Sequence, residues 1–189
     1  MHKFNPEHLE RLLSDERTND ISPERVLKEA GLKAGQIFAD IGAGPGFFSV
    51  PAAKIIGPAG IAFAIDTQAE MLIYLRDRRN PPDNVILIKS EEYEIPLADF
   101  EADFALLAYV LHETGDKVRL LQEIKRVLKP GGTLLVIDWD KKAEEKGPPV
   151  EERITSKEAR GFVEAAGFDV VQTSPLNPSH YGVLSRRPV

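Results

Sequence analysis

The sequence predicts a doubly wound α/β protein, with a seven-stranded, mostly parallel sheet, an antiparallel last strand and helices on both faces. Five short apolar runs alternate with segments that have the apolar spacing of amphipathic helices, which is the pattern of a parallel sheet with helical crossovers. Turns rich in glycine and proline separate these runs. After the fifth run come one more helical segment and two further β-rich runs, which supply the last two strands.

The strands are predicted from runs of apolar and β-branched residues. The run Ile61–Ile65 is nearly all apolar, as expected for a strand that is buried on both faces. The last two runs are separated by Pro175-Leu176-Asn177-Pro178 and are expected to form a closing hairpin, whose final strand pairs antiparallel. The predicted strands are 36–41, 61–65, 84–89, 103–110, 133–138, 169–174 and 181–185.

Capping residues and glycines predict where the helices begin and end. Ser22-Pro23 begins a helix that Gly31 ends. Capping boxes are predicted at Thr67–Glu70 and at Thr155–Glu158. Residues 1–20 carry leucines at helical spacing, which predicts a short amphipathic helix there. The other predicted helices are 46–56, 67–79, 116–129 and 155–166.

Length and hydropathy indicate a single domain over residues 1–189. The chain of 189 residues is long enough for one well-buried core and short for two, and the helices of residues 1–30 are a candidate lid. The N-terminus lacks the apolar segment of a secretory signal, and the longest apolar run, Phe104–Leu111, is too short to cross a bilayer. We therefore expect a cytoplasmic protein without a membrane span.

Composition excludes several kinds of chemistry. The chain has no cysteine, which excludes disulfides, thiolate metal sites and thiol nucleophiles, and we predict no metal site. The net charge of −6 argues against a nucleic-acid partner. Arg76, Arg78 and Arg79 form the one basic cluster weighed as a nucleic-acid patch. They lie in the last turns of a predicted helix, where cations complement the helix dipole, so we interpret them as structural.

The stretch Phe38–Ala53 predicts a ligand site. Gly42, Gly44 and Gly46 alternate with other residues between an apolar strand and a helix, so a ligand can lie against bare backbone. The free N–H groups and the positive dipole end of the following helix are expected to face the same place and to favour an anionic or polar group. A dinucleotide site would need G-x-G-x-x-G, but position 47 is phenylalanine.

Preceded by Asp40 and an apolar strand, this G-x-G-x-G turn resembles the first motif of the class I S-adenosylmethionine (SAM) dependent methyltransferases. The predicted seven-strand plan is similar to the Rossmann-like core of that family along nearly the whole chain, from roughly residue 30 to the end. The resemblance is to the broad group that includes the ubiquinone and menaquinone C-methyltransferases, the type 11 group. A glycine-rich turn by itself also occurs where a helix merely packs closely on a sheet.

Two acidic residues that end strands are the first candidates for holding the cofactor. Asp66 ends the second strand about twenty residues beyond the glycine turn, where a carboxylate can accept both ribose hydroxyls, and its alternative role is a helix charge or cap. The resemblance implies that Asp40 helps to hold the methionine end of SAM. Its alternative role is bonding the N–H groups of the turn itself.

The resemblance implies further cofactor contacts after the third and fourth strands. The family commonly has aspartate followed by a small residue near the adenine, whereas this chain has Ser90-Glu91. The segment Ala108–Glu113 resembles the fourth motif of the family and places residues beside the sulfonium. The predicted cofactor-binding residues are Asp40, Gly42, Ala43, Gly44, Gly46, Asp66, Thr67, Met71, Ser90, Glu91, Ala108, Tyr109 and Leu111.

His112 is the candidate catalytic residue, as a general base. A structural histidine that orients the loop is an equally weighted alternative, because geometry decides before pKa. Trp139, Asp140, His180 and Tyr181 are candidates for covering the substrate, and simple packing or exposure is the alternative for these residues.

The resemblance implies an enzyme that transfers the methyl group of SAM to a small-molecule acceptor by direct in-line displacement, with S-adenosylhomocysteine (SAH) as product. The Asn/Asp-Pro-Pro-Tyr motif of enzymes that methylate exocyclic or amide nitrogens is missing at the fourth strand. The alternatives are a nicotinamide-dependent oxidoreductase, disfavoured by Phe47, and a SAM-binding module without catalysis. Assembly into a homo-oligomer is left open.

Overall fold

A single seven-stranded sheet organises the protein. The computed structural model describes residues 21–144 and 146–189. The strands are β1 (Ile37–Ile41), β2 (Ile61–Asp66), β3 (Val85–Lys89), β4 (Ala102–Ala108), β5 (Leu128–Trp139), β6 (Asp169–Pro175) and β7 (His180–Arg186). Their order is β3-β2-β1-β4-β5-β7-β6, and β7 runs antiparallel to both of its neighbours. The predicted sheet, with its antiparallel last strand, is confirmed.

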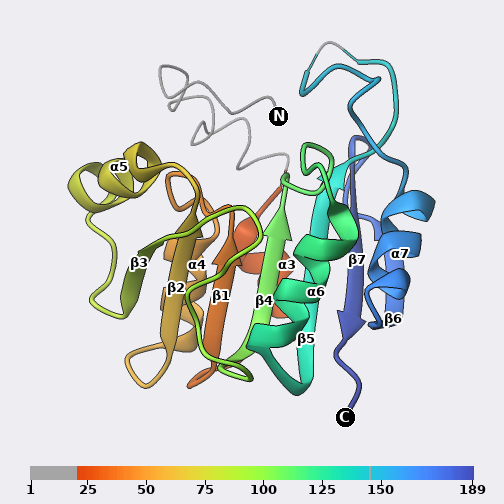
Figure 1. Cartoon of the computed structure of the whole chain (residues 1–189). Coiled ribbons are helices and arrows are strands. Elements are labelled where there is room, and N and C mark those ends of the chain that lie inside the picture. The colour runs from red at the N-terminus through yellow and green to blue at the C-terminus, as the bar shows by residue number, and fades with distance from the viewer. Residues whose placement is uncertain (1–20, 145) are drawn as a thin grey trace.

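Helices cover both faces of the sheet. They are α3 (Pro23–Glu29), α4 (Ser49–Ile56), α5 (Ala69–Arg79), α6 (Lys117–Val127) and α7 (Ser156–Ala165). Figure 1 shows α6 and α7 in front of the sheet and α3 and α4 behind it. The helix expected within residues 1–20 lies outside the described residues.

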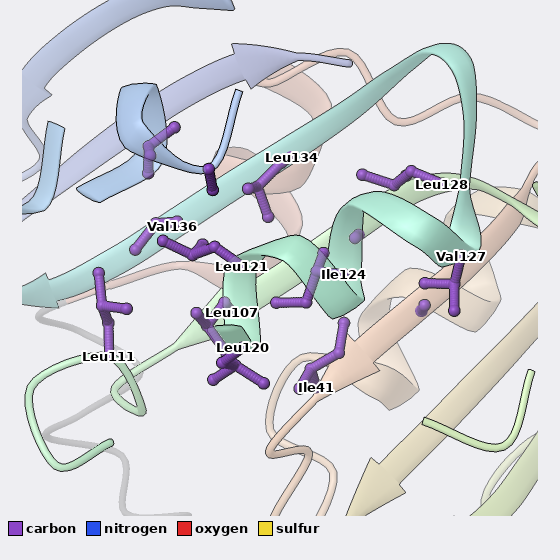
Figure 2. Packing of buried hydrophobic residues seen from close by; sticks show 14 of the residues in the cluster. Ile41, Leu107, Leu111, Leu120, Leu121, Ile124, Val127, Leu128, Leu134 and Val136 are labelled. Atoms are coloured by element: carbon purple, nitrogen blue, oxygen red, sulfur yellow. The ribbon is translucent and has the colours of Figure 1, made fainter. Parts of the chain in front are cut away.

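The alternation of side chains along the central strands divides the core into two layers. Along β4, Leu107 belongs to the layer under α6 and α7, whereas Leu106 belongs to the layer under α3 and α4. Figure 2 shows the apolar face of α6 against β4 and β5. Ile124 at the centre of that face is fully buried, so its truncation to alanine should cost about 2–5 kcal/mol. Since both faces are filled, a ligand has access only at the edges where strands end.

One predicted capping box is confirmed and the other is wrong. At α7 the Thr155 hydroxyl accepts the Glu158 N–H at 3.2 Å, and the Glu158 carboxylate accepts the Thr155 N–H at 2.8 Å. At α5 the N-cap is Gln68, whose side chain makes no capping bond. The Gln68 N–H instead donates to Asp66 at 2.8 Å, so the Asp66 carboxylate takes the capping role that was predicted for Thr67.

Three predicted boundaries shift for physical reasons. Helix α4 begins at Ser49 rather than at 46, because the glycine turn occupies the intervening residues. Strand β4 ends at Ala108, because Tyr109 adopts a left-handed backbone conformation that leaves the sheet. Strand β5 begins at Leu128, and its residues 129–132 bulge between the pairs Ala102–Leu128 and Phe104–Thr133.

Candidate functional site

The polar residues of interest gather where the parallel strands end, at the upper edge of the sheet in Figure 1. This edge carries the loops that follow β1, β2, β4 and β5, together with the start of the antiparallel β7. The loop after β4 lies against the glycine turn, because a Cβ on Gly42 would lie 2.3 Å from the Val110 side chain. The edge is the place where open α/β sheets bind ligands.

The glycine turn has one closely packed side and one open side. Gly46 has φ +81°, and a Cβ there would lie 2.4 Å from the buried Leu75 side chain of α5. Gly44 has φ +53°, and no atom of the described residues lies within 4 Å of the position of its Cβ. Gly46 therefore lets α5 pack, and Gly44 leaves space for a ligand against the backbone.

Replacing Gly46 by alanine should lower the free energy of unfolding by about 2–4 kcal/mol, from left-handed strain and overpacking together. Denaturant unfolding measures the change. The double variant with Leu75→Ala removes the clash but keeps the strain, and should therefore lose less than the sum of the two single losses. Strict additivity would contradict the packing explanation.

Three N–H groups of the glycine turn bond to the end of β2. Gly42 and Ala43 both donate to the Ile65 carbonyl at 2.9 Å, and Gly44 donates to the Asp66 carboxylate at 2.7 Å. These three donors therefore hold the turn against β2. The open face at Gly44 and the carboxylate of Asp66 are what the turn offers a ligand.

Asp66 lies at the centre of this arrangement. It is buried, and its two oxygens accept the Gly44 and Gln68 N–H groups. Burial raises the pKa of Asp66, although the hydrogen bonds from the Gln68 and Gly44 N–H groups, the nearby Thr67 N–H and the charge of Lys89 oppose the rise. Each carboxylate oxygen can accept two hydrogen bonds, so capacity remains for two hydroxyl groups. The helix-terminus role and the ribose role are therefore compatible.

Asp40 is also buried, and it is bonded to the helix that follows the glycine turn. The Ser49 hydroxyl donates to Asp40 at 2.5 Å, which joins the end of β1 to the first residue of α4. The contact fixes the carboxylate directly beneath the glycine turn. Its role toward the methionine end of SAM remains a prediction.

The other predicted cofactor residues fall into two groups. Met71 and Leu111 are fully buried core residues, and Ala108 ends β4 in the layer under α3 and α4. Figure 2 shows Leu111 beside the α6 core. Ser90 is buried and its N–H donates to the Asp66 carbonyl at 3.0 Å, whereas the exposed Glu91 lies 3.5 Å from the Lys89 ammonium. Ser90 is thus linked to the Asp66 region, and Glu91 faces solvent.

Tyr109 is held in a strained conformation next to an aromatic group. Its φ is +63°. This left-handed conformation costs a residue other than glycine about 1–2 kcal/mol, and residues strained in this way cluster at functional sites. Its N–H donates to the Ile137 carbonyl at 2.8 Å. The Tyr109 ring lies 6.0 Å from Trp139 and 5.3 Å from His180, and the last two rings are 4.1 Å apart. We call Tyr109, Trp139 and His180 the aromatic wall.

His112 is paired with Asp138, a residue that the sequence analysis did not single out. The ring Nδ1 lies 2.7 Å from one Asp138 oxygen, and the His112 N–H donates to the other at 3.0 Å. Because a carboxylate only accepts, Nδ1 is assigned as the protonated nitrogen, which leaves the lone pair on Nε2. Burial lowers the pKa of His112, but the hydrogen bond and charge of Asp138, with Glu113 and Glu152, raise it above its ordinary value overall. This is the arrangement of an oriented base.

Glu113 is a second residue that the sequence analysis quoted without assigning a role. Burial, followed by the charges of Asp138, Asp66 and Glu92, raises the pKa of Glu113 to about 7, against the lowering effect of His112. The Glu113 carboxylate therefore interacts electrostatically both with Asp66 and with the His112–Asp138 pair. The sequence does contain a signal for Glu113, since a carboxylate directly follows a candidate histidine at the end of a strand. Groups with perturbed pKa values gather at functional sites, so this position could have been predicted as part of the site.

Replacing Glu113 by glutamine should raise the free energy of unfolding at pH 8 by about 1 kcal/mol, after allowance for solvent screening, and should change it little at pH 4. The folded protein keeps the Glu113 proton to about pH 7, whereas the unfolded chain loses it near 4.5. Stability is therefore lost as the pH rises through this window, and glutamine removes the loss. Urea unfolding at both pH values measures it. The exposed Glu91→Gln is the control, and an equal gain at both pH values would contradict the argument.

Two negative findings apply to the part of the chain that the structure describes. No group of three histidine, aspartate or glutamate residues there is arranged to hold a metal ion. Within the same residues, no helix has the length and apolar character needed to cross a membrane.

The strand order, the antiparallel β7, the glycine turn after β1 and the acidic residue after β2 together define the class I SAM-dependent methyltransferase fold. Residues 39–136 match the family model described as methyltransferase domain, and the chain belongs to this family. A SAM-dependent methyltransferase from Aquifex aeolicus is 38% identical, with a TM-score of 0.93 over 97% of this chain and 99% of that one. Family membership favours a methyltransferase over the oxidoreductase alternative.

Two further comparisons limit what the similarity to known proteins shows about this chain. A demethylmenaquinone methyltransferase of Staphylococcus aureus is 30% identical over 115 residues, which are 61% of this chain and 48% of that protein. The chain therefore spans about half the length of the curated relatives it matches. The [4+2]-cyclase SpnF is 20% identical, with a TM-score of 0.77 over 93% of this chain and 83% of that one, and shares the fold alone.

Proposed function

We propose that the protein transfers the methyl group of SAM to a small-molecule acceptor in a single in-line displacement, with Asp66 holding the cofactor and His112 accepting a proton. The observation that carries the proposal is the bond from the Gly44 N–H to Asp66, which brings the open glycine turn and a buried carboxylate together at one edge of the sheet. Both were predicted separately from the sequence.

The residues present fit the cofactor. Gly44 leaves the space that any Cβ would fill, and the remaining lone pairs of Asp66 can accept two ribose hydroxyls. Of the other predicted contacts, we retain Ser90 for the adenine end and Tyr109 for the sulfonium end, because both lie in the loops of this edge. When bound, SAM supplies an electrophilic methyl group on a sulfonium sulfur.

The chain supplies orientation, exclusion of water and a base. The chain contains no cysteine, and the proposed displacement forms no covalent bond to the protein. Asp138 holds the His112 ring with its Nε2 lone pair available, so an acceptor hydroxyl or enol can lose its proton to Nε2 as the new bond to carbon forms. The His112⁺ so formed is stabilised by the Asp138 charge.

The acceptor is proposed to be a small molecule, covered by the aromatic wall. Tyr109, Trp139 and His180 present ring surfaces at the end of β4, the end of β5 and the start of β7. The S. aureus relative is a demethylmenaquinone methyltransferase, so hydroxylated aromatic compounds head the acceptor panel.

Calorimetry with SAM and SAH, followed by SAH release across an acceptor panel, tests the proposal. We expect binding of both nucleosides and turnover with at least one acceptor. Absence of heat with both would overturn the cofactor assignment. Binding without turnover, across acceptors of every size and polarity, would favour the alternative of a SAM-binding module without catalysis.

A further inference from the structure

A buried guanidinium organises the segment that follows β5. The Arg153 side chain is 1% exposed, although the cost of burying a cation is several kcal/mol unless its donors are bonded. Its donors reach the Glu144 carboxylate at 2.5 Å and four backbone carbonyls, those of Asp140, Lys142, Lys146 and Pro148. Residues 140–144 and 146–152 contain no helix or strand, so Arg153 supplies much of their hydrogen bonding.

The same guanidinium packs on the aromatic wall. Its central carbon lies 5.0 Å from the centroid of the Trp139 ring, within the range of a cation–π contact. The backbone at Gly147 also lies on that ring, since a Cβ there would be 2.8 Å from a ring carbon. Trp139 is therefore partly covered by the segment that Arg153 holds.

A second set of contacts continues from this segment to His180. The Glu144 carboxylate oxygen that is not bonded to Arg153 accepts a hydrogen bond from the Ser179 hydroxyl at 2.7 Å. The Asp140 N–H donates to the Ser179 carbonyl at 2.8 Å. His180 follows directly, and its ring lies 4.1 Å from Trp139. Glu144 thus connects Arg153 to the turn that places His180.

We infer that Arg153 is a positioning residue for the acceptor side of the site: it holds residues 140–144 and 146–152 over Trp139 and, through Glu144 and Ser179, fixes His180. The inference rests on the proposed function, in which the aromatic wall covers the acceptor. Among the described residues, the Arg153 side chain makes no hydrogen bond to the Asp66 region or to His112. Its loss should therefore affect the acceptor and spare the nucleoside.

The single tryptophan of the chain makes the inference directly measurable, because all tryptophan emission comes from Trp139. In Arg153→Gln we expect red-shifted emission, severalfold stronger quenching by acrylamide and SAH affinity within about threefold of wild type. With an acceptor from the panel, its KM should rise by about tenfold or more while the KM for SAM stays constant. Arg153→Lys keeps the charge without the planar fork and should give intermediate quenching.

Arg126→Gln is the matched control. Arg126 also donates to two backbone carbonyls, those of Ile95 and Leu97, but it lies in the last turn of α6, away from the aromatic wall. The Arg126→Gln variant should have a lower free energy of unfolding without a change in the acrylamide quenching of Trp139. If Arg153→Gln does not fold, Glu144→Gln removes the carboxylate that joins Arg153 to Ser179 but leaves the four backbone carbonyls bonded to Arg153, and it should give a smaller change in the same direction.

Unchanged emission and quenching in a folded Arg153 variant would overturn the inference, and so would an SAH affinity that falls as steeply as the acceptor affinity. A failure of the proposed function is distinguishable, because the wild type would then show no heat with SAH while the emission of Trp139 still reports on Arg153.

Discussion

Replacing Asp66 by alanine should abolish measurable SAM and SAH binding. The carboxylate is placed to accept two ribose hydroxyls, and hydrogen bonds to a charged group contribute about 1.5–3 kcal/mol each, which together correspond to about 10²–10⁴-fold in Kd. The loss also releases the Gly44 N–H, so the open face of the glycine turn is no longer fixed. Isothermal titration calorimetry with SAH measures the change without turnover.

Asp103→Ala is the matched control for this prediction. Asp103 is another carboxylate that accepts a backbone N–H, from Ile37 at 2.8 Å, and it also pairs with Lys129. It lies at the opposite end of the sheet, near the start of β4, so its loss should lower stability and leave the SAH affinity within about threefold. Equal SAH affinity in wild type and a folded Asp66→Ala would remove the basis of the cofactor site.

The fold, and the arrangement of the glycine turn beside Asp66 on which the proposed cofactor site depends, were predictable because their signals are local. Apolar runs separated by turn residues predict strands, and a polar residue at the end of such a run, as at Asp66, predicts the binding edge. The same rule placed the glycine turn. It did not predict that Asp66 closes the turn by accepting the Gly44 N–H, because that bond depends on the packing of β2 beside β1.

The acceptor side could not be predicted to the same depth, because its contacts join distant parts of the chain. His112 lies in the loop after β4, and Asp138 lies near the end of β5. Only the register of β4 against β5 brings the two residues together. Asp138 is the last residue of the predicted strand 133–138, and Arg153 lies just before the predicted helix 155–166, where no local pattern indicates that its side chain is buried. Both side chains are fully buried, so their charged groups must be bonded to neighbours, and this burial follows from tertiary packing.

Replacing His112 by glutamine should lower kcat by about 10²–10³, within the range of general acid–base catalysis, and leave the SAH affinity within about threefold. Glutamine can keep one hydrogen bond to Asp138 but has no nitrogen lone pair to accept a proton. The wild-type rate should rise with pH through the raised pKa of His112, because only the neutral ring is a base. The rate of the glutamine variant should lack this rise. Steady-state SAH release between pH 5.5 and 9 measures both, with the acceptor saturating.

The alternative role for His112, as a residue that merely orients the loop after β4, makes a different set of predictions. Asp138 accepts the His112 and Trp139 N–H groups as well as the ring, so the loop is held even without the imidazole. Asp138→Asn should therefore weaken both the loop and the base, with lower stability and lower kcat, whereas His112→Gln should lower kcat alone. A His112→Gln variant with reduced stability and an unchanged pH profile would establish the structural role. A loss of kcat together with the pH dependence, at unchanged stability, leaves proton transfer to His112 as the explanation if Glu113→Gln keeps the rise with pH, because Glu113 in the same loop also has a pKa of about 7.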